Sequence, residues 1–180
     1  MAYVQRTEIP AQQYLHECFE IRPDGIYWKL RPSAHFTSSV AVSSNKKLAG
    51  TKVIGRACGT GYRQVRLNMI SYKLHRIAYK LFHGIVPDLI DHIDRDKCNN
   101  HPSNLREVTH SQNQFNRGKQ SNNTSGFKGV TFHIQNKNWV SQIHHQGKHI
   151  HVGSFGTPEE AHVAYLKKAK SLVGDFALGG

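Results

Sequence analysis

Residues 90–117, which read IDHIDRDKCNNHPSNLREVTHSQNQFNR, decide the central fold of this chain. A short strand is expected at 90–93, a polar loop at 94–103 and a second strand at 105–108. Thr109 and Gln112 then form a capping-box pattern, which begins a helix at about His110. The segment therefore predicts strand, loop, strand and helix in that order.

The same segment collects side chains that suit the hydrolysis of a phosphodiester. A histidine titrates near neutrality, so His92 fits a general base, and Asn104 is expected to hold the strands in register and fix its imidazole. A hard cation such as Mg²⁺ prefers oxygen ligands and takes only one or two from the protein. Asp91 and the amide of Asn113 meet that need. With Thr109 as the cap, Asn113 shares a helix face with Arg117.

The charge of the chain indicates a polyanionic partner. The net charge is +12 with a pI near 9.8, and neither residues 25–87 nor residues 108–158 contain a carboxylate. Double-stranded DNA is the expected partner. The acidic residues between these stretches include Asp91, which is expected to bind a metal. Asp88, Asp94 and Asp96 are expected to be solvated turn residues.

The cysteine content and the apolar runs of the chain predict a protein in a reducing compartment. Cys18, Cys58 and Cys98 are an odd number at wide spacing, which supports neither a disulfide framework nor a cysteine zinc site. No apolar run reaches membrane-spanning length and the N-terminus lacks a signal-peptide core. We expect an intracellular, cytoplasmic protein that is not secreted, does not enter membranes and is a monomer or weak dimer.

Four regions are expected along the chain. Residues 1–70 form a β-rich region with strand candidates at 26–30, 51–54 and 62–67, and the Ser/Asn/Lys-rich residues 32–47 are expected to be a loop. Residues 71–117 form the central module, 118–125 a polar linker and 126–180 a separate domain.

A helix is expected from Ser71 to a stop at Gly84, because an apolar stripe repeats with helical spacing. Lys73, Arg76 and Lys80 form a basic row on another face. This row either contacts phosphates or is simply solvated, and the sequence leaves both interpretations open.

The last region predicts a three-stranded antiparallel sheet packed on one helix. Strands are expected at 128–133, 139–144 and 148–152, and the helix opens at Thr157 with a capping box. Alternation assigns one face of the sheet to the core: Val130, Phe132, Trp139, Ile143, Ile150 and Val152. The opposite face carries Lys128, Thr131, His133, Gln142, His144, His149 and His151, which are candidates for DNA contact or, less plausibly, for a transition-metal site.

The central segment resembles the HNH endonucleases of the ββα-metal fold, in particular homing-type enzymes of phage. The resemblance rests on Asp91-His92, Asn99-Asn100, Ser103-Asn-Leu-Arg, Asn113 and the upstream Leu74-His-Arg-Ile-Ala-Tyr. It implies that His92 is the general base, that Asn104 orients it, and that Asp91 and Asn113 bind one divalent ion, Mg²⁺ or alternatively Mn²⁺. The third family position is often histidine, and His110 or Asn116 could replace Asn113 there.

The last region resembles the plant ethylene-response-factor (APETALA-type) DNA-binding domain. The matching residues include Ser125-Gly-Phe-Lys-Gly-Val, Trp139, Val152-Gly-Ser-Phe and Thr157-Pro-Glu-Glu-Ala. In that family the sheet face opposite the helix enters the major groove. Histidines and Gln142 stand here where plant members carry arginines, so strong bidentate reading of guanine is not expected.

Together these features predict an α+β protein: a β-rich N-terminal region with a helix, a central ββα-metal HNH module and a sheet-and-helix DNA-binding domain. The expected function is metal-dependent cleavage of DNA by an intracellular endonuclease of a phage-infected host. Two alternatives remain, a DNA-binding regulator that does not cut and, less favoured, an RNA-binding protein.

Overall fold

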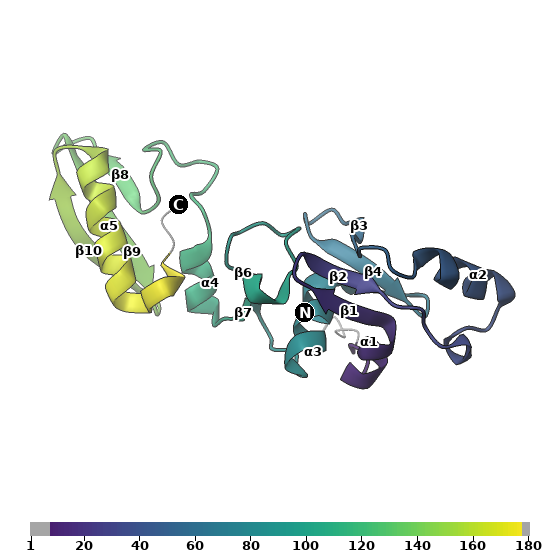
Figure 1. Cartoon of the computed structure of the whole chain (residues 1–180). Helices are drawn as coiled ribbons and strands as arrows, with labels where there is room; N and C mark the ends of the chain where they lie inside the picture. The colour runs from purple at the N-terminus through teal and green to yellow at the C-terminus, as the bar shows by residue number, and fades with distance from the viewer. Residues whose placement is uncertain (1–7, 178–180) are drawn as a thin grey trace, which may run out of the picture. The chain divides into compact units, whose positions relative to one another are not determined.

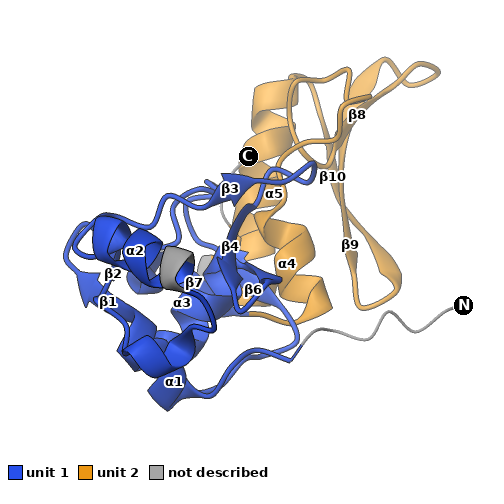
Figure 2. Cartoon of the chain, turned by 90° about the vertical axis from the view of Figure 1, so that its right-hand side faces the viewer, with its two compact units in different colours: residues 1–107 blue, residues 108–180 orange. Residues whose placement is uncertain are grey.

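The computed structural model describes residues 8–177 and contains two compact units, residues 1–107 and residues 108–180 (Figures 1 and 2). Each unit is described by itself below. The boundary falls between strand β7 and helix α4, within the segment whose sequence predicts a ββα module. The expected class, α+β with small antiparallel sheets, is confirmed.

Unit 1 starts with helix α1 (Gln12–Cys18) and the antiparallel hairpin β1 (Phe19–Arg22) and β2 (Gly25–Trp28). Helix α2 (Ser39–Leu48) follows, and strands β3 (Arg56–Ala57), β4 (Arg63–Leu67) and β5 (Ile70–Lys73) form a second small sheet in the order β3-β4-β5.

Helix α3 (Leu74–His83) supplies most of the core of this unit. Its residues Leu74, Ile77, Ala78 and Leu81 are almost completely buried, as the apolar stripe predicts. They pack in one cluster with residues of α1, β1 and β4. The helix ends at Gly84, whose positive φ of 79° suits glycine at this position.

The last elements of unit 1 are β6 (Ile90–His92) and β7 (Leu105–Glu107), which pair antiparallel around the polar loop 93–104. A short 3₁₀ turn, Pro102–Asn104, leads into β7.

Unit 2 starts with helix α4 (His110–Asn116), followed by a sheet of β8 (Val130–His133), β9 (Asn138–His145) and β10 (Lys148–Phe155) in the order β10-β9-β8. Helix α5 (Pro158–Val173) packs on this sheet (Figure 1). Phe115, Ile143, Tyr165 and Ala169 form the core. Both helices begin with the expected capping boxes, at Thr109 and Thr157.

Several expectations for the individual elements were wrong. Residues 32–47 are not all loop, because α2 forms there, and 51–54 contributes only one isolated bridge, Tyr27 with Lys52. Residues 70–73 form strand β5, so α3 begins at Leu74 rather than at Ser71. Phe132 is 42% exposed rather than in the core, because β8 is an edge strand, and its ring packs against Trp139 across the strands.

Within residues 8–177, no helix is both long and apolar enough to cross a membrane.

Candidate active site

The hairpin β6–β7 positions the first two candidate residues. Asp91 lies opposite Arg106, and His92 lies opposite Leu105. Both residues are buried, with 8% of the surface of Asp91 and 4% of that of His92 exposed. A carboxylate and an imidazole at adjacent buried positions are costly to place unless each has a partner, so their surroundings determine what they can do.

The imidazole of His92 is held by Asn100. Its Nε2 lies 3.2 Å from Oδ1 of Asn100, a buried residue of the 93–104 loop. The amide nitrogen of Asn100 donates to the carbonyl of Cys98, which leaves Oδ1 as the acceptor for the ring. The proton of neutral His92 is therefore on Nε2, and the lone pair is on Nδ1.

Tyr62 and His75 line the other sides of this imidazole. The ring centroid of His92 lies 5.4 Å from that of His75, in an edge-to-face arrangement, and 5.9 Å from that of Tyr62. Tyr62 and His75 also contact each other, at 4.9 Å. These contacts restrict the orientation of His92 from faces that Asn100 does not touch.

His75 is neutral at physiological pH. Burial, followed by the neighbouring charge of His92, lowers the pKa of His75 to about 3. Its Nδ1 is buried without a hydrogen-bond partner among the described residues. His75 therefore adds a ring next to His92 but no positive charge.

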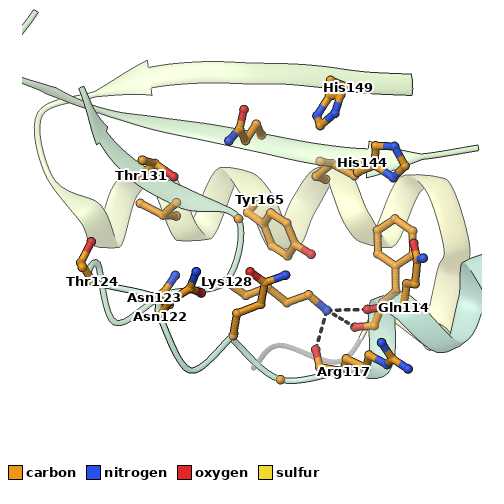
Figure 3. A pocket seen from close by; sticks show the side chains of 17 residues that line it. Gln114, Arg117, Asn122, Asn123, Thr124, Lys128, Thr131, His144, His149 and Tyr165 are labelled. Carbon is orange, nitrogen blue, oxygen red and sulfur yellow. Dashed lines mark hydrogen bonds between the residues drawn. The ribbon is translucent and has the colours of Figure 1, made fainter. Parts of the chain in front are cut away.

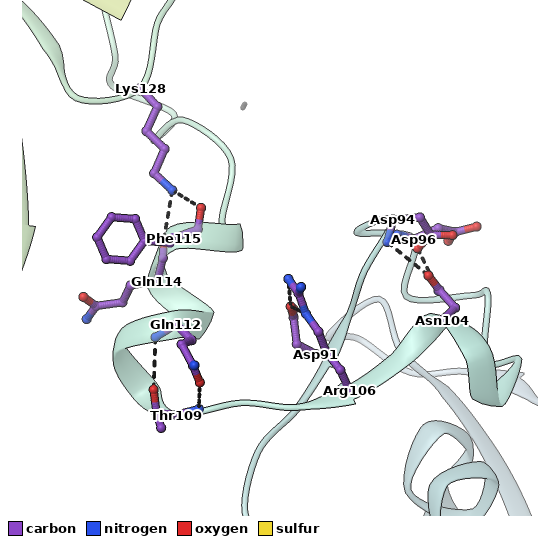
Figure 4. A network of polar contacts seen from close by, with 10 residues as sticks. All are labelled: Asp91, Asp94, Asp96, Asn104, Arg106, Thr109, Gln112, Gln114, Phe115 and Lys128. Carbon is purple, nitrogen blue, oxygen red and sulfur yellow. Dashed lines mark hydrogen bonds and ion pairs between the residues drawn. The ribbon is translucent and has the colours of Figure 1, made fainter. Parts of the chain in front are cut away.

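Asn104 shapes the loop rather than contacting the imidazole of His92. Its amide donates to Oδ1 of Asp94 at 2.8 Å, and its Oδ1 accepts from the backbone N–H of Asp94 (Figure 4). The amide also donates to the carbonyl of Asn99, at 2.8 Å. The backbone of Asn104 also accepts from Ile93, which agrees with the expected role in strand register. The hydrogen bond expected between Asn104 and His92 is instead made by Asn100.

Asp94 is a structural residue of this loop. Burial alone would raise the pKa of its carboxyl, but hydrogen bonds from Asn99 and Asn104 hold the pKa below its usual value. The ionised carboxylate accepts from three groups at once, from Asn99, Asn104 and the backbone of Asp96. It is more than the solvated turn residue that the sequence suggests.

Asp91 forms an ion pair with its cross-strand neighbour Arg106. The guanidinium Nε and Nη2 lie 3.2 Å and 3.1 Å from Oδ2 of Asp91 (Figure 4). Both side chains are largely buried, with 10% of Asp91 and 16% of Arg106 exposed. A carboxylate is the ligand type that a hard cation prefers, so Asp91 fits one by its chemistry. A cation would compete with Arg106 for Oδ2.

The other candidate ligand, Asn113, lies on α4 in unit 2. Its side-chain amide has no hydrogen-bond partner among the described residues of that unit, so its oxygen is available. Its placement relative to Asp91 stays a prediction from the sequence. Among residues 8–177, no three His, Cys, Asp or Glu side chains gather closely enough to hold a metal, so a site here would use few protein ligands.

The basic row makes contacts within unit 1, and its first member, Lys73, is the last residue of β5 rather than part of α3. Nζ of Lys73 lies 3.1 Å from both Sγ of Cys58 and Oγ1 of Thr60. Arg76 and Lys80 donate to the backbone carbonyls of Asp88 and Ile9, respectively. Each cation of the row thus has a hydrogen-bond partner within the unit, and all three side chains are only partly buried.

The sheet of unit 2 presents most of its expected polar residues on one exposed face. His144 lies opposite His149, and Gln142 lies opposite His151, so all four side chains share a face. The rings of His144 and His149 are in contact, with centroids 4.7 Å apart. Thr131, His133 and Arg117 are also exposed.

Lys128 does not belong to this exposed set. Its ammonium donates to the backbone carbonyls of Gln114, Phe115 and Arg117, at 2.9, 2.7 and 2.5 Å (Figure 3). It therefore caps the C-terminal end of α4, where carbonyls lack helical partners. Strand alternation does not apply to Lys128, which precedes β8, and its expected contact with DNA stays a prediction.

The sequence alone did not single out Asn100, His75, Tyr62 or Arg106 as site residues. Asn100, His75 and Arg106 all lie in the motifs that carry the HNH resemblance. Tyr62 lies outside those motifs and carried no signal.

Comparison with known proteins identifies the segment that contains this site. Residues 72–115 match the HNH endonuclease family model. This HNH segment covers α3, β6, β7 and nearly all of α4, and it includes Asp91, His92, Asn104 and Asn113.

Sequence similarity to one relative extends beyond the HNH segment. An uncharacterized HNH endonuclease of Acanthamoeba polyphaga mimivirus is 36% identical over 121 residues, which is 66% of this chain and 62% of the relative. The chain thus spans less than two thirds of the length of that protein. No solved structure matches the chain.

Proposed function

We propose that this chain is a metal-dependent HNH endonuclease of the homing type, which hydrolyses phosphodiester bonds of double-stranded DNA. The observation that carries the proposal is the buried imidazole of His92, fixed by Asn100 and lined by Tyr62 and His75, directly after Asp91 in β6. The match of the surrounding segment to HNH endonucleases supports it.

In this proposal His92 is the general base. Asn100 holds the proton of the ring on Nε2, so Nδ1 takes the proton from the attacking water. Because the ring of His92 is already held in one orientation, little conformational entropy is lost when the substrate binds, and this favours proton transfer. Because His75 is neutral, it places no positive charge of its own beside the ring that takes up the proton.

Asp91 and Asn113 would hold one divalent ion, Mg²⁺ or alternatively Mn²⁺. This assignment rests on the HNH resemblance and on the oxygen donors of the two side chains. When bound, the ion supplies electrostatic stabilisation of the charge that develops on the phosphate and on the leaving oxygen. Arg106 would have to release Oδ2 of Asp91 before the ion could bind there.

Unit 2 would supply most of the affinity for DNA. Its sheet exposes His133, Gln142, His144, His149 and His151, and Arg117 precedes the sheet. This surface belongs to a stretch, residues 108–158, without a single carboxylate. Contacts of this kind go largely to phosphates, so binding should weaken strongly as salt rises.

The proposal also covers the oligomeric state and the cellular location of the protein. One set of catalytic residues in each chain suits a nicking monomer or a weak dimer that cuts both strands. The resemblance to homing-type enzymes and the match to a viral protein support action on DNA inside an infected cell.

One observation favours a second function, a DNA-binding protein that does not cut. The Asp91–Arg106 ion pair occupies the carboxylate that a metal would need, as a structural remnant of a nuclease site would. Sequence-specific binding to DNA without nicking in Mg²⁺, Mn²⁺ or other divalent ions would establish this alternative.

The proposed function is tested by incubating supercoiled plasmid with the protein in Mg²⁺ or Mn²⁺, with and without EDTA. We expect relaxed or linear DNA that appears only with the metal, and a strong loss of cutting in Asp91→Asn. Plasmid cut equally well in EDTA would contradict the metal dependence, and plasmid left intact in every divalent metal would contradict the nuclease.

A further inference from the structure

Unit 2 contains a hollow that the catalytic proposal does not use. It lies between the C-terminal end of α4, the loop 117–128 and the edge of the sheet where β8 stops short of covering β9 (Figure 3). Its volume is about 670 Å³. Small-molecule sites typically measure roughly 300–1,000 Å³, so the hollow is large enough for a ligand.

The wall formed by the loop is held by internal hydrogen bonds. Lys128 donates to three carbonyls at the end of α4, and Lys119 donates to the carbonyl of Gly126. The amide of Asn123 donates to the carbonyl of Phe127, and the hydroxyl of Ser125 lies within hydrogen-bond distance of the carbonyls of Phe127 and Val130, at 2.9 and 2.8 Å. The hollow is therefore bounded by a loop with a defined course.

Neutral hydrogen-bonding side chains dominate the lining. No described residue donates to or accepts from these side-chain amides and hydroxyls, which are those of Gln114, Gln120, Asn122, Thr124, Thr131 and Gln142. No carboxylate lines the hollow, and Arg117, Lys128, His144 and His149 give it a basic margin. Such a lining suits a ligand whose inserted part is neutral and polar and whose exposed part, at the margin of the hollow, is negatively charged.

Aromatic rings complete the interior. Phe115 and Tyr165 line the hollow, and each is at least nine-tenths buried. The ring of Tyr165 lies against Gly129, where any Cβ would come within 2.3 Å of it, so glycine at this position keeps the ring in place. The hydroxyl of Tyr165 has no partner among the described residues, and burial raises its pKa to about 12, so it stays a neutral donor.

We propose that this hollow binds a single nucleobase that projects from a DNA strand, with the amides on its polar edge and the aromatic rings beside its face. Asparagine and glutamine pair with base edges, and bases stack on aromatic side chains. A base inside a duplex is covered on both faces by its neighbours and cannot enter a concave site, so the ligand is an unpaired or flipped base. The proposal rests on the proposed DNA binding of unit 2.

The test uses the full chain carrying His92→Ala, so that the probes stay uncut. Affinity is measured by fluorescence anisotropy for three matched duplexes: one fully paired, one with a single unpaired adenine, and one with an abasic residue at the same bulge. The abasic probe keeps the bend and the phosphates but lacks the base. We expect the adenine bulge to bind about tenfold tighter than the abasic bulge, as one stacked base typically gives.

Two double variants distinguish the hollow from the rest of the sheet. Asn122→Ala with Gln142→Ala should abolish the preference for the adenine bulge, and both positions are exposed, so the fold should persist. The second double variant, His133→Ala with His151→Ala, changes residues of the sheet outside the hollow. It should weaken the binding of all three probes equally and keep the preference for the adenine bulge.

The outcomes separate the two proposals. Equal binding of the adenine and abasic bulges, or a preference that survives in the Asn122/Gln142 variant, would overturn the nucleobase site while leaving DNA binding intact. Failure to bind any duplex would overturn both. Free adenosine monophosphate that competes as strongly as the bulged duplex would reassign the site to a soluble nucleotide.

Discussion

His92 can act as a base at one defined atom because Asn100 determines which ring nitrogen carries the proton. The hydrogen bond between Nε2 and Oδ1 of Asn100 leaves the lone pair on Nδ1, and the rings of Tyr62 and His75 restrict the orientation. The pKa of the base should therefore respond to a charge placed at residue 100.

Asn100→Asp is expected to shift the pH profile of cleavage. A carboxylate next to Nε2 favours the protonated imidazole, so the pKa of His92 should rise and the acidic limb of the rate should move up by about one pH unit. The measurement is the single-turnover cleavage rate between acidic and alkaline pH. Asn68→Asp, which adds the same charge on the exposed β4–β5 turn, should leave the limb in place; an unshifted limb in Asn100→Asp would contradict the contact.

Arg106 and a divalent ion are expected to compete for Asp91. Replacing Arg106 with Gln should remove the ion pair of a buried carboxylate and lower the free energy of unfolding by about 3 kcal/mol without metal. Mn²⁺ should then stabilise the variant more than the parent chain, because binding no longer has to displace the guanidinium. Thermal unfolding with and without Mn²⁺ checks both effects.

The control for this competition is Arg56→Gln, which removes an exposed arginine from β3. Its thermal unfolding should respond to Mn²⁺ as the parent does. If Arg106→Gln also responded only as the parent does, Asp91 would not be a metal ligand.

At the scale of residues, the sequence could name candidate residues but not the hydrogen bonds between them. The motif spacing singled out Asp91 and His92, which are buried neighbours in β6, and their catalytic roles stay predictions. It could not distinguish Asn100 from Asn104, because both amides lie in one loop whose course depends on the turns at Asp94 and Asp96. Which amide meets the imidazole depends on that course.

At the scale of elements, the packing of α3 against the hairpin β6–β7 creates a pH-dependent term in stability. Folding lowers the pKa of His75 from 6.5 to about 3, so the unfolded chain takes up a proton first as the pH falls. The stability that depends on neutral His75 is fully present above the pKa of this residue in the unfolded chain, 6.5, and is lost progressively as the pH falls from 6.5 to 3.

We therefore expect the parent chain to lose about 2 kcal/mol of stability through His75 between pH 7 and pH 5. His75→Phe keeps a ring at this position but cannot be protonated, so its unfolding free energy should depend less on pH. Urea unfolding at both pH values gives the comparison. The exposed His16→Asn variant should keep the dependence of the parent, and an unchanged dependence in His75→Phe would be inconsistent with the burial of a neutral His75.

Helix α4 should depend on Lys128 for its C-terminal cap. Lys128→Met removes the donor to three carbonyls and should lower the stability of unit 2 by about 1–2 kcal/mol. Lys167→Met, on the exposed face of α5, removes the same charge and should change stability little. Thermal unfolding compares them; equal stability in the two variants would show that the cap is unimportant.

Elements with strong periodicity were predictable, and those without it were not. The apolar stripe of α3 and the capping boxes at Thr109 and Thr157 located three helices. Helix α2 was missed because its Ser/Asn/Lys-rich sequence has no clear apolar face, and β5 was missed because its residues directly precede the stripe of α3. The bulge between His151 and Gly153 also breaks the alternation that places Val152.

At the scale of the whole molecule, the two compact units carry different parts of the proposed chemistry. Asp91, His92 and Asn104 belong to residues 1–107, whereas Asn113, the exposed sheet face and the hollow belong to residues 108–180. The sequence predicted a nuclease module followed by a DNA-binding domain, and those borders stay a prediction. A local motif does not determine where the cooperative packing of a chain divides, because that depends on contacts distant in sequence.

The most direct test of the account is the single-turnover cleavage rate of His92→Ala on plasmid DNA in Mg²⁺, alongside its affinity for the same DNA. Because His92 is assigned as the general base and not as a binding residue, the rate should fall by about 10²–10⁴-fold while the affinity stays that of the parent chain. A His92→Ala variant that cuts as fast as the parent, with binding unchanged, would contradict the assignment.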